Sequence, residues 1–509
     1  MKRALISVSD KTGIVELTKE LVELGYEIIS TGGTKKTLDE AGIKTLSISD
    51  ITSFPEIMDG RVKTLHPNVH GALLCVRDNK NHLKALEDNK IDLIDMVVVN
   101  LYPFKETLAK KNVTHEELIE NIDIGGPSML RSAAKNYKSV TVIVDPKDYK
   151  AVVCELKEAG DTLLETRERL AAKVFRHTSS YDTLIAEYLT NKVEEKFPET
   201  ITVTYEKVQD LRYGENPHQK AGFYKKSFAG YSMGNAKQLH GKELSYNNIQ
   251  DANAALEILK EFKEPTVVAV KHMNPCGVGS GKNINEAWKK AYEADKTSIF
   301  GGIVVSNLCI TKMVAEDLSK LFLEIIIAPS FEKEALDIIT QKKNIRVLQI
   351  DMESEILNKM KVTSVMDGAL IQEFDEMKVS KDELICVTER KPTDEEIEAL
   401  IFTWNVVKHV KSNAIVVGKD NQTIGIGAGQ MNRVGAAKIA LEQGHKKCEG
   451  AVLASDAFFP MDDTVELAAK FGITAIIQPG GSIKDTLSIE ACNKHGIAMV
   501  FTGVRHFKH

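Results

Sequence analysis

The first 150 residues alternate short apolar runs with amphipathic stretches, which is the layout of an α/β domain. One early stretch repeats apolar residues at the three- and four-residue spacing of a buried helix face, namely Ile14, Leu17, Leu21 and Leu24. The apolar runs predict strands at 4–9, 26–30, 45–49, 96–102 and 140–144, with a short helix at 36–41. The last two runs are almost continuously apolar, as expected of parallel strands covered on both faces. Such a sheet binds its ligands at the carboxyl ends of the strands.

A second part begins after a helical pattern over about 161–189. The polar stretch TNKVEEKFPET (190–200) follows this helix, so we expect domains at 1–198 and 199–509. Two passages of the second part are similar, TVVAVKHMNPCGVGSG (266–281) and AIVVGKDNQTIGIGAGQ (414–430). Each has the pattern of an apolar strand, a polar turn and a glycine-rich loop. They indicate an internal duplication, and chance similarity of two short passages is the alternative.

Composition narrows the class of protein. A chain of 509 residues is too long to fold around a single hydrophobic core, so we expect more than one domain. With 43% hydrophobic and 27% charged residues, its composition is that of an ordinary globular protein. A formal net charge of -6 gives no basic footprint for nucleic acid. The seven cysteines form no C-x-x-C pair, which favours a reducing compartment. The pattern contains no signal peptide or membrane helix, so we expect a cytoplasmic protein without a membrane partner.

Several turns of the first part carry groups that bind anions. STGGT (30–34) and DIGGPSMLRSAAKN (123–136) each lead into a helix, and glycines let backbone N–H groups approach an anion there. Ordinary capped turns are the alternative. In GRVKTLHPNVHG (60–71), alternation would place Arg61 and Lys63 on one side, where they suit a phosphate or an oxyanion; a solvated basic loop is the alternative. Pro67 lies between His66 and His70, so the helical metal motif H-E-x-x-H is absent.

These motifs occur in a recognisable order. The order is SVSDKTG (7–13), STGGT, GRVKTLHP (60–67), NLYPF (100–104), IDIGG (122–126) and SAAKN (132–136). In order and spacing they resemble the inosine monophosphate (IMP) cyclohydrolase domain of the bifunctional purine-biosynthesis enzymes. The resemblance implies a methylglyoxal-synthase-like domain with a parallel sheet. It also implies the closure of the pyrimidine ring of formyl-AICAR with loss of water.

The resemblance assigns roles to particular residues of the first domain. Ring closure within one molecule needs orientation, donors for the formyl oxygen and a proton for the departing oxygen. The resemblance places four residues around the reacting groups: Lys63, Tyr102, Asp123 and Lys135. It assigns substrate binding to Ser7, Ser9, Lys11, Ser30, Gly32, Gly33, Thr34, Arg61, Thr64, Gly125 and Gly126. Which group moves each proton stays open.

In the second part, a Lys271-His272 pair ends an apolar strand. The glycine-rich stretch after it lacks the spacing of a P-loop, and Pro275-Cys276 lacks the second cysteine of a zinc deaminase. GIGAGQ (425–430) departs from the dinucleotide fingerprint at its last position. Burial at the strand end would favour a neutral imidazole as general base, beside an ammonium that stabilises an oxyanion. The alternative is a capping histidine with a lysine that reaches solvent.

A second ordered set of motifs decides between these interpretations. It comprises LRYGENPHQ (211–219), VKHMNPCG (270–277), FGGIV (300–304), IIAP (326–329), VKSNAIVV (410–417), GIGAGQMNRV (425–434) and SDAFFPMDD (455–463). These resemble the AICAR transformylase part of the same bifunctional family. The resemblance implies two cytidine-deaminase-like α/β subdomains without catalytic metal and a homodimer. It also implies formyl transfer from the co-substrate 10-formyltetrahydrofolate to AICAR.

By this resemblance His272 is the base, assisted by Lys271 and Asn413. The nucleotide would be bound by Arg212, Tyr213 and Arg505, and the folate by Arg433, Phe458 and Asp463. Met461 and Asp462 depart from the family pattern and affect only the expected folate contacts. The competing hypotheses are a nucleotide-binding regulatory protein without catalysis and a zinc-dependent deaminase. The first disagrees with the intact lysine, aspartate and histidine positions, and the second requires bound zinc.

Overall fold

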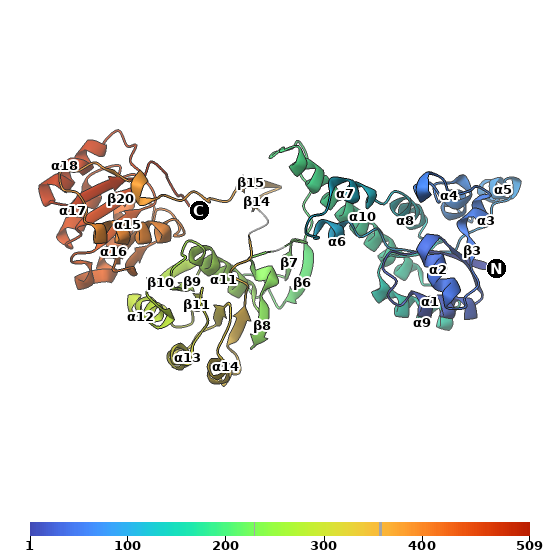
Figure 1. The fold of residues 1–509 in the computed structure, drawn as a ribbon, viewed down its shortest axis with the longest axis horizontal. Helices are drawn as coiled ribbons and strands as arrows, with labels where there is room; N and C mark the ends of the chain where they lie inside the picture. Colours follow the sequence, from blue (N-terminus) through green and yellow to red (C-terminus); the bar gives the residue numbers. More distant parts are fainter. Residues whose placement is uncertain (229, 356–358) are drawn as a thin grey trace. The chain divides into compact units, whose positions relative to one another are not determined.

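The structure is a computed structural model that describes residues 1–228, 230–355 and 359–509. It contains two compact units, Met1–Thr204 and Tyr205–His509 (Figure 1). The division falls in the segment that follows the long helix α10 (Leu164–Lys192), a few residues after the position expected from the sequence. Among the described residues, no helix is long and apolar enough to cross a membrane.

The first unit is built on a parallel five-stranded sheet of order β3-β2-β1-β4-β5. The strands are β1 (Lys2–Ser7), β2 (Tyr26–Ser30), β3 (Leu46–Ser47), β4 (Met96–Val99) and β5 (Thr141–Ile143). The parallel sheet predicted from the apolar runs is confirmed. The strand expected at 45–49 is shorter, because the Ser47 side chain caps the helix α3 (Ile48–Thr52) that follows at once.

Helices cover both faces of this sheet. One face packs against α1 (Ile14–Glu23), α2 (Gly32–Glu40) and α9 (Tyr149–Ala159). The other packs against α4 (Pro67–Leu74), α8 (Gly125–Lys135) and α10. Within β1, Ala4 and Ile6 belong to one core and Leu5 to the other, which explains why this run of the strand is continuously apolar. Shorter helices complete the unit: α5 (Lys80–Asp88), α6 (Phe104–Leu108) and α7 (His115–Glu120).

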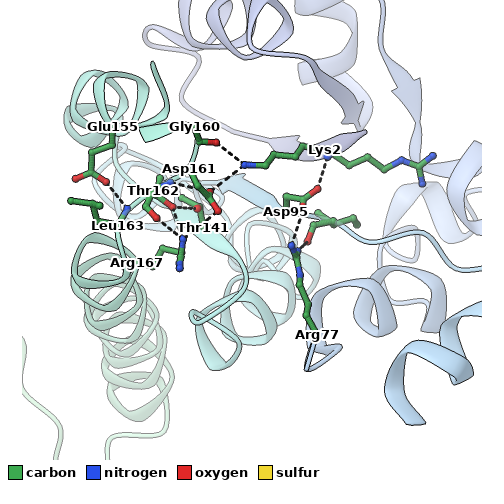
Figure 2. A network of polar contacts seen from close by, with 12 residues as sticks. Lys2, Arg77, Asp95, Thr141, Glu155, Gly160, Asp161, Thr162, Leu163 and Arg167 are labelled. Atoms are coloured by element: carbon green, nitrogen blue, oxygen red, sulfur yellow. Dashed lines mark hydrogen bonds and ion pairs between the residues drawn. The ribbon is translucent and has the colours of Figure 1, made fainter. Parts of the chain in front are cut away.

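Polar contacts hold the amino-terminal edge of the sheet together (Figure 2). Lys2 Nζ donates to the carbonyl of Gly160 at 2.9 Å, and Arg77 Nη1 donates to Asp95 Oδ1 at 2.8 Å. The hydroxyls of Thr141 and Thr162 lie 2.6 Å apart and tie β5 to the segment before α10. These contacts stabilise this edge of the sheet.

The second unit contains a twelve-stranded sheet with an internal repeat. From one end its order is β8-β13-β12-β11-β9-β10, and from the other it is β16-β21-β20-β19-β17-β18, with β10 paired to β18. The first half comprises β8 (Lys237–His240), β9 (Thr266–Lys271), β10 (Asn274–Ser280), β11 (Ile303–Ser306), β12 (Ile325–Ala328) and β13 (Arg346–Gln349). The second comprises β16 (Ile385–Cys386), β17 (Ile415–Lys419), β18 (Gln422–Gly427), β19 (Val452–Ser455), β20 (Ala475–Gln478) and β21 (Ala498–Phe501).

The helices repeat in the same way. One face of the sheet shares a core with α11 (Tyr246–Leu259) and α15 (Asp394–Val407). The other face packs against α12 (Ile284–Ala294), α13 (Lys312–Ser319) and α14 (Lys333–Ile339) in the first half. In the second half it packs against α16 (Arg433–Gly444), α17 (Asp463–Lys470) and α18 (Asp485–His495). Two hairpins lie outside this sheet, β6 (Glu206–Leu211) with β7 (Ala221–Lys225) and β14 (Met360–Val365) with β15 (Gly368–Glu373).

The two glycine-rich stretches are strands, not the loops that the sequence pattern suggested. They form most of β10 and β18, each of which packs against the helix that follows it. A Cβ on Gly279 would lie 2.5 Å from Ala291 N in α12, and one on Gly427 would overlap Ala436 O in α16. These glycines therefore allow close packing of helix on sheet.

Candidate active sites

A cavity of about 720 Å³ opens at the carboxyl edge of the sheet in the first unit. The segments that follow β1, β2 and β4 line it, together with the start of α8 and the loop 59–64. Thirteen of the residues expected for this domain line the cavity: Ser7, Ser9, Lys11, Gly32, Gly33, Thr34, Arg61, Lys63, Thr64, Tyr102, Asp123, Gly125 and Gly126. The structure thus brings together segments that are distant in sequence, as parallel topology requires.

Two expected site residues lie elsewhere. Ser30 is fully buried in β2, and its hydroxyl donates to Ile6 O at 2.9 Å, so it supports the sheet. Lys135 is exposed at the last position of α8. The cavity is lined by the first residues of that helix, Gly125 and Gly126. Lys135 lies ten residues after Gly125, which at 1.5 Å per residue is about 15 Å along the helix axis. Neither residue lines the cavity.

The cavity is suited to an anionic ligand. It meets the amino-terminal ends of two helices, α2 and α8, whose first N–H groups lack helical partners. Lys11 Nζ donates to Thr34 Oγ1 at 3.1 Å and also to the carbonyl of Val8. Burial lowers the pKa of Lys11, although the charge of Asp10 acts in the opposite direction. An anion in the cavity would meet this desolvated ammonium directly.

Asp123 lies beside these cationic groups. Its Oδ1 accepts from Gly126 N at 2.8 Å, and its own N–H donates to the hydroxyl of Tyr181 at 2.9 Å. Burial raises the pKa of Asp123, although hydrogen bonds from the backbone and the charge of Lys63 lower it. A Cβ on Gly32 would lie 3.8 Å from Lys63 Nζ, so this ammonium is next to the start of α2. The site therefore combines a carboxyl that retains its proton more readily with an ammonium close by.

Sequence reasoning missed several lining residues, of which Asn100 is the most informative. Its Oδ1 accepts from the N–H groups of Ser9 and Asp10 at 2.5 and 3.0 Å, and its Nδ2 donates to Asp10 O at 3.0 Å. Asn100 thus holds the segment after β1 from the end of β4. Its position within the motif NLYPF was the available signal. A second missed residue is Glu120, whose carboxylate pairs with Arg61 at the cavity.

In the second unit, Lys271 and His272 lie where β9 turns into β10. His272 and Met273 form a two-residue turn, and their φ values are 54° and 62°. Asp251 in α11 accepts from His272 N at 3.3 Å through Oδ2 and from Met273 N at 2.7 Å through Oδ1. Lys271 Nζ donates to the carbonyl of Phe300 at 2.8 Å. The His272 side chain is exposed in the single chain, because the turn projects beyond the ends of β9 and β10, so one chain alone does not provide the expected shelter from water.

Arg212 lines a separate cavity of about 480 Å³ with several other cations. Lys242, Lys342, Lys343 and Arg346 also line it, and Glu324 pairs with Arg346 at 2.7 Å. Phe322 forms part of its wall and packs on Phe300 with ring centroids 5.3 Å apart. Because the carbonyl of Phe300 accepts from Lys271, the cationic cavity and the Lys271-His272 turn are neighbours.

The remaining candidates for this unit divide into two groups. Asn413 is held through its N–H and Nδ2, which donate to Gln430 O at 3.1 and 2.8 Å. Arg433, expected on the folate side, is buried, and its guanidinium pairs with the buried Asp456. The other candidates are on the surface or half-buried: Tyr213, Phe458, Asp463 and Arg505. The cavity lined by Arg212 includes none of them.

Two family models match the chain. The AICARFT/IMPCHase bienzyme family matches residues 133–443, and the MGS-like domain matches residues 13–128. The chain is 64% identical to the bifunctional purine biosynthesis protein PurH of Bacillus cytotoxicus over the whole length of both chains. It is 63% identical to PurH of Bacillus cereus and 62% identical to PurH of Bacillus mycoides, again with full coverage of both. A structure titled "Crystal structure of ForH" is 35% identical, with 37% of this chain and 96% of that chain covered and a TM-score of 0.34.

Proposed function

Because the chain belongs to the AICARFT/IMPCHase bienzyme family, we propose that its two units divide the two reactions of that family between them. The chain is an enzyme of purine biosynthesis. It transfers a formyl group from 10-formyltetrahydrofolate to AICAR and closes the ring of formyl-AICAR to give IMP. Ring closure belongs to Met1–Thr204 and formyl transfer to Tyr205–His509. The convergence of Lys63, Tyr102 and Asp123 on one cavity carries the first assignment.

In the first unit, the cavity binds formyl-AICAR with its phosphate near the start of α2. The N–H groups of Gly32 and Gly33, the Thr34 hydroxyl and the ammonium of Lys11 serve this phosphate. The carboxamide nitrogen is then held close to the formyl carbon of the same molecule. Orientation of this kind lowers the activation barrier, because the entropy that two separate reactants would lose on meeting is already lost.

Ring closure makes an N–C bond and expels the formyl oxygen as water, and the two protons of that water are balanced by one lost from the carboxamide nitrogen and one from the formamide nitrogen. As the carboxamide nitrogen attacks, negative charge develops on the formyl oxygen, and the Lys63 ammonium stabilises it. The oxygen then needs a proton in order to leave. Burial raises the pKa of Asp123, so its carboxyl keeps a proton to higher pH than an exposed aspartic acid and can donate it. Tyr102, which is 41% exposed, stands at the mouth of the cavity beside the reacting groups.

In the second unit, the cationic cavity lined by Arg212 binds the phosphate of AICAR, and the adjacent turn holds the reacting amine. His272 accepts the proton that the 5-amine loses as it forms the new C–N bond to the formyl carbon. Lys271 stabilises the oxyanion of the tetrahedral intermediate. When the bond to N10 of the folate breaks, that nitrogen takes up a proton. The contact from Lys271 through Phe300 to Phe322 supports this arrangement.

A second copy of the chain completes the transferase site. His272 is exposed in the single chain, and general base catalysis gains from exclusion of water. The hairpin of β14 and β15 also exposes apolar side chains: Val362, Val365, Met366 and Leu370 are 42%, 47%, 98% and 62% exposed. A homodimer that covers both features explains them together. Sedimentation equilibrium should give twice the monomer mass.

The division of labour is tested with two variants and two assays. His272→Ala should abolish production of formyl-AICAR from AICAR and 10-formyltetrahydrofolate, yet convert supplied formyl-AICAR to IMP at the wild-type rate. Asp123→Ala should do the reverse, so that formyl-AICAR accumulates. Loss of both activities in either variant, with the fold intact, would show that the sites are not separate. Binding of AICAR without any turnover by the wild type would instead favour the regulatory hypothesis.

A further inference from the structure

We propose that Asp251 is a positioning residue for formyl transfer, which holds the turn of His272 and Met273 so that the imidazole stays beside Lys271. The proposal rests on the role proposed above for His272. Asp251 lies in α11, 21 residues before His272, and its carboxylate accepts from two backbone N–H groups of the turn. The charge of the His272 imidazole also acts on this carboxylate. We assign the effect of Asp251 on the reaction to the geometry of the turn.

The turn needs support because of its residues. Both central residues of the turn have positive φ, as a type I′ turn requires, and that turn prefers asparagine, aspartate or glycine. Histidine and methionine are strained in this region. Two consecutive N–H groups of such a turn point the same way and form a concave anion site. Asp251 fills it with one carboxylate oxygen for each N–H, at 3.3 and 2.7 Å.

The opposite side of the turn is also held. Asn274 Nδ2 donates to His272 O at 3.1 Å, and Asn274 Oδ1 accepts from Lys411 N at 3.3 Å. The carbonyl of the turn is thereby linked to the segment that carries Asn413. Asp251 and Asn274 together fix both backbone polar groups of His272. The imidazole then projects from a backbone that cannot rotate freely.

The internal repeat shows that the fold itself does not require this carboxylate. The helices α11 and α15 both have 14 residues and begin after a capping box, at Ser245 and Thr393. The sixth residue is Asp251 in α11 and Ala399 in α15. The hairpin of β17 and β18 still forms a two-residue turn with positive φ, made of Asp420 and Asn421. The carboxylate is thus present only where the turn carries His272.

The experiment compares kcat and KM for formyl transfer in Asp251→Asn, Asp251→Ala, Met273→Gly and the Asp251→Ala/Met273→Gly double variant. Asp251→Ala should lower kcat about 100-fold, which is the loss expected when a catalytic group moves by about 1 Å. The KM for AICAR should be nearly unchanged. Glycine adopts positive φ without strain, so the double variant should recover about tenfold relative to Asp251→Ala. Asp420→Ala, which removes a carboxylate from the second turn, should leave kcat unchanged.

Each outcome decides between the two proposals. Wild-type kcat in both Asp251 variants, together with an inactive His272→Ala, would overturn the positioning role and leave the proposed function standing. Full activity of His272→Ala would overturn the proposed function itself. A loss in Asp251→Ala that Met273→Gly fails to recover would also overturn the positioning role. Cyclisation of supplied formyl-AICAR by the same preparations reports the fold of the other unit, and thermal unfolding reports that of this one. If Asp251→Ala does not fold, the isosteric Asp251→Asn, which keeps an acceptor for one N–H, decides the question.

Discussion

The two hairpins of the repeated sheet have the same backbone and opposite residue choices. In β17–β18 the turn is Asp420-Asn421, two residue types that tolerate positive φ. In β9–β10 the turn is His272-Met273, which gains neither advantage and depends on a carboxylate from α11. The positive φ values are common to both turns and belong to the fold, whereas the residues His272 and Met273 occur only in the first turn. The turn with the residues less suited to positive φ is the one that carries the proposed general base, His272.

Elsewhere the halves obey the same rules. Strand glycines pack against α12 in one half and α16 in the other, because a Cβ in either place would overlap helix backbone. Glu261 and His409 occupy equivalent positions, each two residues after the end of α11 or α15, and they bond to each other at 2.9 Å. The halves therefore differ at the turn and agree in the framework that surrounds it.

The largest expected effect comes from making the first turn resemble the second. His272→Asn should lower kcat for formyl transfer by about 10²–10⁴-fold, the contribution of a general base. The same change should raise the free energy of unfolding by about 1 kcal/mol, since asparagine tolerates positive φ. Kinetic assays and urea unfolding measure the two effects. Asp420→His, which places histidine at the corresponding position of the second turn, should cost stability without affecting transfer; a loss of transfer there would contradict the comparison.

The next effect concerns the pair that joins the halves. Burial opposes ionisation, but the hydrogen bond from His409 and the charges of His409 and Lys408 outweigh it and lower the pKa of Glu261 to about 2. The folded pKa is depressed, so the stabilisation is complete above the ordinary value of 4.5 and is lost as pH falls toward 2. Glu261→Gln should destabilise the second unit by about 3 kcal/mol at pH 7, because it removes the carboxylate nearest to the buried ammonium of Lys408.

Urea unfolding between pH 7 and pH 2 measures this difference. The wild type and Glu261→Gln should converge as the pH falls below 4.5. A constant difference over the whole range would show that the carboxylate charge is not the source of the stability.

A smaller effect tests the shared framework. Gly279→Ala and Gly427→Ala should each destabilise the second unit by about 1–3 kcal/mol, because the added methyl overlaps helix backbone that is already closely packed. Chemical unfolding of both variants gives the two values, which should be similar. A large loss in one half only would mean that the two helices do not pack alike.

The smallest effect lies in the second turn. Asp420→Ala should lower the free energy of unfolding by about 1 kcal/mol, since alanine is less tolerant of positive φ. Both enzymatic reactions should keep their wild-type rates, because the turn lies in the half without the Lys-His pair. Reduced formyl transfer in this variant would mean that the second turn also serves the chemistry.

Much of the first unit was predictable because its signals are local. Continuous apolar runs predicted β1, β4 and β5, and the glycine turns after strands predicted the cavity. The failures have one cause: membership of a motif does not reveal where a side chain points. Ser30 ends a strand and faces inward, whereas Lys135 lies at the far end of the helix that begins at the cavity. Burial of Arg433 against Asp456 was hidden for the same reason.

The sequence by itself determined the periodic burial, the parallel sheet of the first unit and the chemical identity of the Lys271-His272 pair. These properties depend on residue type and on spacing within a few turns of chain. Only the tertiary structure decided that Asp251 meets the turn, that Asn100 holds the end of β1 and that His272 is exposed. Such contacts join segments tens of residues apart, and their geometry depends on how helices and strands pack.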